Sequence, residues 1–345
     1  MNEQGLTRDQ LNIYTQGYAA FQFLTSGVEL GLFDLLAKSP GLSAAQIAAA
    51  LGLETQPLRI LLSGVVALKL VHESEGAYRN DPLVEQTLIA SSPRSMIPVL
   101  RWIKYGINRG LTDMTESIRQ NRNVGVQRFG GEGNTIYERL ESEPELERIF
   151  HDCLSMFAMQ APMALSKVDV FGTLNHVLDI GGGDGTHAMS LARAFPNLKV
   201  TIFDSPGVCA AAERKIAEAG FADRIDTHSG DFFTDPFPAG ADGIFMAELT
   251  PIWSPERNKA LFQKARETLP SGGALVILSV MMDNAETGPL GAALFSPYFL
   301  TLASGEGMAY PASDYEAWLQ ETQFSDVRTI ATGLPLNQQV VIGIS

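Results

Sequence analysis

The spacing of hydrophobic positions divides the chain into two parts. Residues 1–165 carry apolar side chains at helical intervals, as in Phe21, Leu24, Val28 and Leu32, with few runs typical of strands. Residues 166–345 instead alternate short apolar runs with amphipathic stretches, a pattern that predicts strands joined by helices. We therefore predict a helical domain over 1–165 and an α/β domain over 166–345, built on a doubly wound, mostly parallel sheet.

The helical part contains a pattern typical of a winged helix. Ser43 is a helix-capping residue, a second helix is expected over residues 56–62, and the runs 70–73 and 77–79 can pair as a small wing. Such a motif could bind DNA, but residues 43–88 hold three basic side chains against five acidic ones, the reverse of a phosphate-binding face. We therefore expect a packing and dimerisation module, with a DNA-binding regulator as the rival hypothesis.

The densest chemical signal is Val-Leu-Asp-Ile-Gly-Gly-Gly-Asp-Gly at residues 177–185. Glycines at 181 and 183 let the backbone bend sharply after a strand and approach a ligand closely. A dinucleotide or S-adenosylmethionine could occupy such a turn, and Asp204, at the end of the next predicted strand, could bind ribose hydroxyls in both cases. The dinucleotide spacing G-x-G-x-x-G is absent, and an acid with an aromatic neighbour, Asp231-Phe232, follows one strand later. These features favour S-adenosylmethionine.

Length, charge and cysteine content narrow the function classes. With 345 residues and 45% hydrophobic content, the chain can bury two cores. A net charge of -14 argues against nucleic acid and membrane surfaces as partners. Residues 1–10 are polar and no apolar stretch has spanning length, so we expect a cytoplasmic protein. Cys153 and Cys209 lack metal-ligand spacing, which predicts neither a disulfide framework nor a metal site.

These motifs together resemble the small-molecule O-methyltransferases of bacterial secondary metabolism and plant phenolic pathways, over nearly the full chain. The resemblance implies a class I methyltransferase fold with S-adenosylmethionine as cofactor and a small molecule as substrate. It also implies an N-terminal winged-helix-like domain that forms a homodimer and helps to cover the substrate. The residues that it assigns to the cofactor are Asp179, Gly181, Gly182, Gly183, Gly185, Asp204, Ser205, Asp231 and Phe232.

The segment after the fourth predicted strand departs from the family pattern. Family members carry a sequence like L-H-D-W there, and its histidine takes the proton from the substrate hydroxyl. This chain reads Thr250-Pro251-Ile252-Trp253, with proline where the histidine belongs. Since proline cannot accept a proton, the resemblance implies a methyltransferase without the usual base. Glu248 and Thr250, at the end of that strand, are our candidates to orient or deprotonate the acceptor.

The acceptor atom and the reaction stay open at this level. A sulfonium is a strong electrophile, so positioning alone can accelerate methyl transfer to an acidic phenol or enol, an amine or ring nitrogen, or an activated carbon. Two alternatives remain: a methyltransferase-like protein that uses S-adenosylmethionine for another reaction, and a non-catalytic winged-helix binding or regulatory protein. The residues that we expect around an aromatic or conjugated substrate are His151, Met156, Trp253 and Tyr298.

Overall fold

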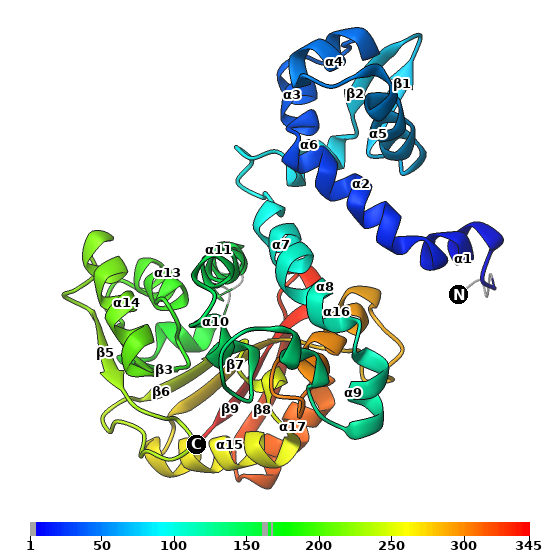
Figure 1. Ribbon diagram of the computed structural model, residues 1–345. Helices are drawn as coiled ribbons and strands as arrows, with labels where there is room; N and C mark the ends of the chain where they lie inside the picture. Colours follow the sequence, from blue (N-terminus) through cyan, green and yellow to red (C-terminus); the bar gives the residue numbers. More distant parts are fainter. Residues whose placement is uncertain (1–4, 161–164, 167) are drawn as a thin grey trace. The chain divides into compact units, whose positions relative to one another are not determined.

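The computed structural model describes residues 5–160, 165–166 and 168–345. Internal contacts divide the chain into two units, Met1–Lys104 and Tyr105–Ser345, whose elements are labelled in Figure 1. This boundary differs from the one expected near residue 165. The helices α9 (Met114–Gln120) and α11 (Pro144–Gln160) continue the helical pattern of the first part, but they pack on the second unit's α16 (Leu290–Thr301) and α13 (Thr186–Ala194), respectively. Helical periodicity reveals an apolar face and does not reveal what covers it.

The first unit is a helical domain with a two-stranded wing. The Ser43 hydroxyl accepts the Gln46 amide hydrogen at 3.4 Å, and the Gln46 side chain accepts that of Ser43 at 2.8 Å, a capping box that starts α4. Glu75 and Gly76, with φ of 52° and 79°, close the antiparallel hairpin β1–β2. The elements of this unit are α1 (Arg8–Thr15), α2 (Gly17–Glu29), α3 (Leu32–Lys38), α4 (Ala44–Leu51), α5 (Thr55–Ala67), β1 (Val71–Ser74), β2 (Ala77–Asn80), α6 (Pro82–Thr87) and α7 (Ile97–Trp102).

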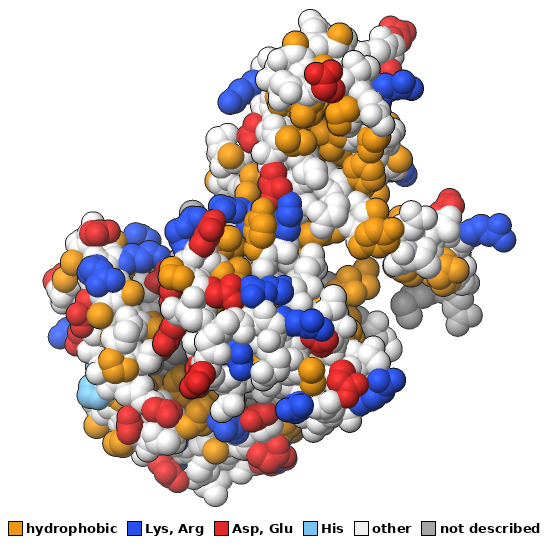
Figure 2. All heavy atoms as spheres, viewed as in Figure 1, with side chains coloured by type: hydrophobic (Ala, Val, Ile, Leu, Met, Phe, Trp, Pro, Cys, Tyr) orange, Lys and Arg blue, Asp and Glu red, His pale blue; other side chains and the backbone are white. Residues whose placement is uncertain are grey.

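Hydrophobic side chains lie open on the surface of the first unit, as Figure 2 shows. Leu11, Ile13 and Tyr14 of α1 and Tyr18 of α2 are between 48% and 75% exposed. A concentration of large apolar side chains on one short stretch is typical of an interaction surface. Within the part of the chain that the structure describes, no single helix is long and apolar enough to cross a membrane; only α2 and α3 together, bent by 54°, meet that length and composition.

The second unit contains a sheet with the strand order β5-β4-β3-β6-β7-β9-β8, which confirms the predicted doubly wound, mostly parallel fold. Strands β5, β4, β3, β6 and β7 are parallel, and β9 is antiparallel to β7 and β8. The chain runs outward from β3 to β5 and then returns to β6 on the other side of β3. Ligands bind at the carboxyl ends of strands where the order reverses in this way. The strands are β3 (His176–Ile180), β4 (Lys199–Asp204), β5 (Ile225–Ser229), β6 (Gly243–Ala247), β7 (Ala274–Val280), β8 (Ser325–Ala331) and β9 (Gln338–Ile344).

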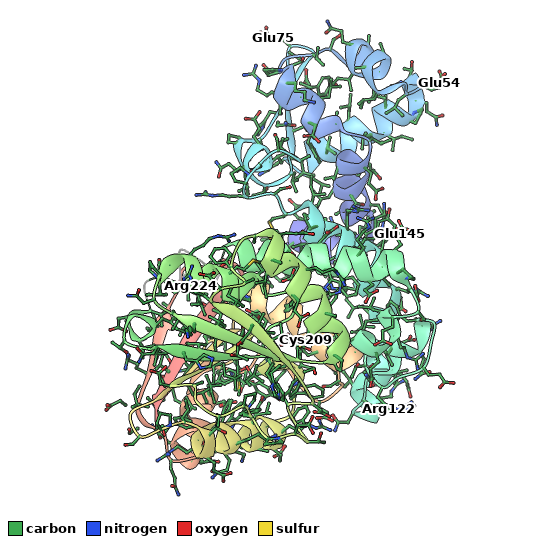
Figure 3. All side chains as sticks on the ribbon, turned by 90° about the vertical axis from the view of Figure 1, so that its left-hand side faces the viewer. Glu54, Glu75, Arg122, Glu145, Cys209 and Arg224 are labelled. Carbon is green, nitrogen blue, oxygen red and sulfur yellow. The ribbon has the colours of Figure 1, made fainter. Side chains whose placement is uncertain are left out.

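Helices cover both faces of this sheet (Figures 1 and 3). On one face α13 and α14 (Pro206–Glu218) enclose a core that includes Ile202 and Ala212. On the other, α15 (Pro255–Thr268) and α17 (Ala312–Glu321) enclose Phe262 and Tyr315. Cys209, labelled in Figure 3, is a buried, free thiol on α14. Shorter helical segments are η1 (Ile103–Ile107), α8 (Asn108–Leu111), η2 (Val124–Arg128), α10 (Ile136–Leu140), η3 (Asp169–Gly172), η4 (Thr250–Ile252) and η5 (Pro335–Asn337).

Candidate active site

The glycine turn begins where the ladder between β3 and β4 ends. The amide of Gly181 still donates to the carbonyl of Phe203 at 2.9 Å, and the chain then bends away from the sheet. Gly181, Gly183 and Gly185 have φ values of 68°, 57° and 80°, a backbone region in which other residues are strained. A Cβ atom built on Gly183 meets no described atom within 4 Å. The turn therefore presents bare backbone next to open space at the carboxyl end of β3.

Asp179 lies directly beneath this turn and is fully buried. Neither of its carboxylate oxygens has a hydrogen-bond partner among the described residues. A Cβ atom on Gly182 would lie 2.8 Å from the Asp179 Cγ, so the glycine is required for the close approach. Burial, with the nearby charge of Asp204, raises the pKa of Asp179 to about 8. A buried acid without partners at a strand end is suited to a cationic ligand.

Asp204 links the glycine turn to the end of β4. Its Oδ2 accepts the Gly183 amide hydrogen at 3.0 Å and its Oδ1 accepts that of Ser205 at 2.7 Å. Burial raises the pKa of this carboxyl group, although the two backbone donors oppose the shift. Because a carboxylate offers about four acceptor positions, two remain for hydroxyl groups of a ligand. Ser205 itself is exposed and caps α14 without a side-chain hydrogen bond to the helix.

Asp231 and Phe232 follow the end of β5, one strand further out. The Asp231 Oδ1 accepts the amide hydrogen of Phe233 at 2.7 Å, which forms a tight turn. The ammonium group of Lys264, on α15, donates to the carbonyl oxygens of Phe232 at 2.8 Å and Asp235 at 2.7 Å. This lysine ties the turn to α15.

An aromatic cluster joins this turn to the segment after β6. The ring centroids of Phe232 and Phe233 lie 4.9 Å apart, and Trp253 packs edge-on against Phe233 at 4.8 Å. The guanidinium of Arg257 lies 4.6 Å from the Phe233 centroid and forms an ion pair with Glu306 at 3.1 Å. The structure thus groups Trp253, expected near the substrate, with Phe232, expected near the cofactor.

Glu248 occupies the carboxyl end of β6 with a strained backbone, at φ of 54°. Its carboxylate accepts hydrogen bonds from the side chain of Gln338 at 2.5 Å and from the backbone amide of Val280. Burial raises the pKa of Glu248 to about 7, although both donors oppose the shift. A carboxyl group that titrates near neutral pH can exchange a proton with a bound molecule.

Thr250 and Pro251 lie in the η4 turn that follows Glu248, and both are buried. The Thr250 hydroxyl is bonded to the Tyr315 hydroxyl at 3.0 Å, and its carbonyl accepts from Asn258 at 2.9 Å. A Cβ atom on Gly307 would lie 2.0 Å from the Pro251 carbonyl oxygen, so this glycine allows the two segments to touch. Thr250 therefore fixes the loop through its side chain.

Of the remaining substrate candidates, Met156 and Tyr298 are buried and His151 is not. The His151 side chain is 47% exposed and lies 4.0 Å from Glu147 on the same helix. Met156 is 9% exposed, on α11. The Tyr298 hydroxyl, on α16, is bonded at 3.3 Å to that of Tyr137 on α10. Burial keeps the pKa of both tyrosines above the usual range, so both phenols stay protonated at ordinary pH.

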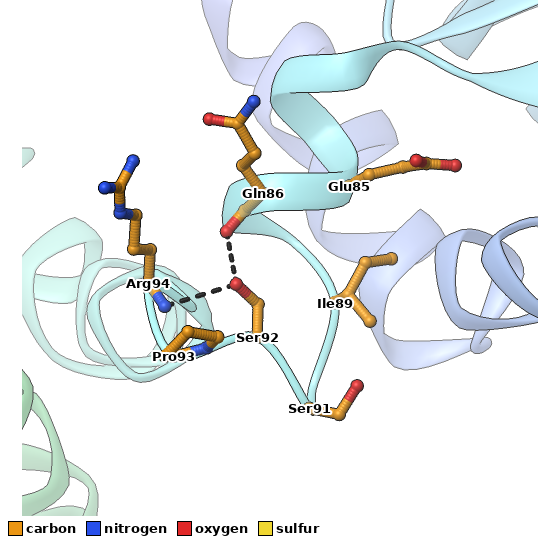
Figure 4. A pocket seen from close by; sticks show the side chains of 7 residues that line it. All are labelled: Glu85, Gln86, Ile89, Ser91, Ser92, Pro93 and Arg94. Carbon is orange, nitrogen blue, oxygen red and sulfur yellow. Dashed lines mark hydrogen bonds between the residues drawn. The ribbon is translucent and has the colours of Figure 1, made fainter.

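A surface hollow in the first unit contains none of these residues. It lies between α6 and α7 and is lined by the segment from Glu85 to Arg94 (Figure 4). The Ser92 hydroxyl crosses it, donating to the Gln86 carbonyl at 2.5 Å and accepting from the Arg94 amide at 3.2 Å.

A model of the O-methyltransferase domain family matches residues 111–325, and a model of the O-methyltransferase dimerisation domain matches residues 13–88. The chain belongs to the O-methyltransferase family. It is an S-adenosylmethionine-dependent methyltransferase of small molecules, as the sequence motifs predicted.

Two relatives and one solved structure place the enzyme within this family. L-tyrosine C(3)-methyltransferase of Streptomyces lavendulae is 37% identical over 310 residues, which cover 90% of this chain and 84% of the relative. 3-Hydroxy-5-methyl-1-naphthoate 3-O-methyltransferase of Streptomyces sahachiroi is 31% identical over 94% of this chain and 91% of the relative. The crystal structure of the S-adenosylmethionine-dependent methyltransferase SibL superposes with a TM-score of 0.86 and 36% identity, over 97% of this chain and 98% of that one.

The strand ends fit S-adenosylmethionine chemically. This cofactor carries positive charge on its sulfur and its amino group, and its ribose has two hydroxyl groups. Asp179 supplies two buried carboxylate oxygens without partners, and Asp204 supplies acceptor positions beside the open space at Gly183. The site therefore offers carboxyl groups to a ligand that carries positive charge on its sulfur and its amino group.

Two further features of the site were missed by the sequence analysis. Asp184 accepts hydrogen bonds from Ser155 on α11 at 3.0 Å and from Thr186 at 2.7 Å, and it pairs with Lys215 on α14. Burial opposes its ionisation, but Lys215 and Thr186 together hold the pKa of Asp184 below its usual range. The Asp-x-Thr spacing is a local signal of a capping turn. Gln338, the partner of Glu248, has no such signal.

Proposed function

We propose that this enzyme methylates a small phenolic acceptor at the ring carbon next to the hydroxyl group, without the histidine base of its family. The observation that carries the proposal is Glu248, a half-buried carboxylate at the carboxyl end of β6. It precedes the segment in which the family resemblance puts Pro251 at the position of the histidine. Glu248 supplies the base that such a reaction needs. Thr250 positions the loop that follows it.

The relatives support a phenolic acceptor. The relative that is 37% identical is named for methylation at C(3) of L-tyrosine, the ring carbon next to the one that bears the hydroxyl. The relative that is 31% identical is named for methylation of a naphthoate hydroxyl oxygen. Both acceptors are phenols, so methylation of the phenol oxygen is the second candidate function.

The cofactor-binding residues follow from the strand ends. We assign the turn 181–185 and Asp179 to the methionine part of S-adenosylmethionine, Asp204 to the ribose, and Asp231 with Phe232 to the adenine. The hydroxyl of Ser205, next to Asp204, makes no hydrogen bond to α14 and is assigned as a further donor at this edge. Trp253 packs with the Phe232 side of the site.

The acceptor side is assigned to α11 and α16. Met156 and Tyr298 present a thioether and a phenol from these helices, and His151 lies on the exposed side of α11. A flat apolar acceptor suits the walls that these side chains of α11 and α16 form.

The match to a dimerisation domain, with the exposed apolar side chains of α1 and α2, supports a homodimer.

The chemistry at Glu248 is a proton relay. Glu248 accepts the proton of the phenol hydroxyl, which places negative charge on the ring carbon beside it. When bound, S-adenosylmethionine would supply an electrophilic methyl group: the bond from this carbon to the methyl would form as the methyl–sulfur bond breaks with its electron pair on sulfur. The ring proton then leaves to water, and Glu248 returns its proton to the phenolate oxygen. One proton is released per turnover.

The test uses L-tyrosine and a panel of simple phenols deuterated at both ring carbons beside the hydroxyl. Mass spectrometry after reaction with S-adenosylmethionine should show a methylated product that has lost one deuteron. A product that keeps both deuterons identifies oxygen or nitrogen methylation and refutes the carbon proposal. No product with any phenol refutes the acceptor class.

Glu248→Gln tests the base. We expect kcat to fall by about 10²- to 10⁴-fold, the usual loss when a general base is removed. Glu256→Gln, at an exposed acid on α15, is the control and should retain activity. Full activity of Glu248→Gln would contradict the role of Glu248.

A further inference from the structure

Glu248 is held in place by one pair of residues on neighbouring strands. Val280, at the end of β7, is the register partner of Gln338, at the start of β9. The backbone amide of Val280 and the side-chain amide of Gln338 both donate to the Glu248 carboxylate. Because β9 runs antiparallel, its first residue lies at the edge where the parallel strands end.

The contact between Gln338 and Glu248 has a fixed direction. A carboxylate can only accept, so the Gln338 side chain must present its NH₂ group to Glu248. Gln338 is 6% exposed, and its backbone carbonyl oxygen accepts a hydrogen bond from the Thr332 hydroxyl. The hydrogen bond therefore joins two residues, Gln338 and Glu248, whose backbones are fixed by the sheet, and little water reaches the Gln338 side.

Besides Gln338 and Val280, an ionisable side chain of the described structure interacts with the charge of Glu248. Tyr315, on α17, lies close enough for the Glu248 charge to raise its pKa, although burial is the larger cause. The Tyr315 hydroxyl is bonded to Thr250, and the phenol stays neutral at ordinary pH. The charge state of Glu248 is therefore controlled mainly by burial and by its two amide donors.

We propose that Gln338 is a positioning residue of the reaction: its amide keeps the Glu248 carboxylate ionised and turned so that its second oxygen, Oε2, faces the acceptor proton. This inference rests on the proposed role of Glu248 as base. A side-chain donor is suited to this task because it favours the charged form of the base without competing for its proton.

The test is the pH dependence of kcat/KM with S-adenosylmethionine and the phenol that is turned over, for the wild type and two variants at this position. Gln338→Met keeps the length of the side chain and removes the donor. It should move the acid limb of the profile upward by about one pH unit, the usual effect of losing one hydrogen bond to a charge. Gln338→Glu places a second carboxyl group there and should move the limb further, since two like charges at one site disfavour ionisation.

Two controls separate positioning from a structural role. Gln339→Met alters the next residue of β9, whose side chain points to the other face of the sheet, and should leave the limb unchanged. In a Glu248→Gln background, Gln338→Met should cause no further loss of rate, because its effect acts through Glu248.

The outcomes distinguish the two ideas. If Glu248→Gln retains full activity, the proposed base is wrong and the inference falls with it. If Glu248→Gln is impaired but Gln338→Met leaves the acid limb in place, or lowers the rate equally in both backgrounds, Gln338 is a structural residue and the inference alone is overturned. An ordered upward shift from wild type through Gln338→Met to Gln338→Glu supports it.

Discussion

Replacing Asp179 with asparagine should reduce the pH dependence of the enzyme's stability. Asp179 is fully buried, neither oxygen has a partner in the described structure, and its pKa is raised to about 8. The pKa in the unfolded chain is about 3.9. Since the folded value is the higher one, the unfolded chain binds fewer protons between these limits, and stability falls as the pH rises from about 4 to about 8.

The shift sets an upper limit on the effect. About four pKa units correspond to about 6 kcal/mol at 1.36 kcal/mol per unit. Local relaxation and water entry reduce such penalties, and we take about 2 kcal/mol as the loss between pH 5 and pH 8 that is due to Asp179. For a folding unit of this size that is about 4–8 °C in Tm.

The assay compares thermal unfolding of wild type and Asp179→Asn at about pH 5 and about pH 8. The fall in Tm between the two conditions should be smaller in the variant by about 4–8 °C. Comparing falls rather than single Tm values removes any constant effect of the asparagine amide. Asp226→Asn, at an exposed acid on β5, is the control and should behave like the wild type. An equal fall in Asp179→Asn would refute the buried, unpartnered acid on which the cofactor site is built.

Three further predictions concern the cofactor turn and the loop after β6. Gly183→Ala adds a Cβ at a φ of 57° into open space, and the free energy of unfolding should fall by about 1–2 kcal/mol. Calorimetry should show at least about a tenfold loss of S-adenosylhomocysteine affinity. Unchanged affinity would place the cofactor elsewhere. Pro251→His should give no gain in methylation rate with a phenol, because the buried η4 turn is packed against Gly307; a large gain would contradict the assignment of Glu248. Lys264→Met removes the donors that hold the Asp231–Asp235 turn and should weaken S-adenosylhomocysteine binding by about 3- to 10-fold with little change in kcat; a loss confined to kcat would argue against adenine binding there.

The parts of the fold that sequence could predict are those with a strong local pattern. The apolar run before Gly181 and the acid at Asp204 place two strand ends, and the structure confirms the parallel sheet that they imply. The capping residue Ser43 likewise marks the start of a helix through a contact three residues away. Such signals are written in neighbouring residues, so one sequence suffices.

Contacts between distant segments could not be predicted in the same way. The contact-based division after Lys104 differs from the boundary predicted near residue 165, because the helical pattern of α9 and α11 does not indicate that they pack on α16 and α13. The strand β8 has mostly exposed or half-exposed residues, which gives it a weak pattern. Gln338 meets Glu248 across 90 residues of chain and through an antiparallel strand, and nothing near either residue indicates this.

The most direct test of the account is calorimetric titration of S-adenosylhomocysteine into the wild type, Asp204→Ala and Glu248→Gln. Asp204 is assigned to the cofactor and Glu248 to the acceptor. Asp204→Ala should therefore lose at least about 100-fold in affinity, about 2.7 kcal/mol, whereas Glu248→Gln should stay within about threefold of the wild type. Tight binding by Asp204→Ala, or an equal loss in Glu248→Gln, would contradict this division of the site.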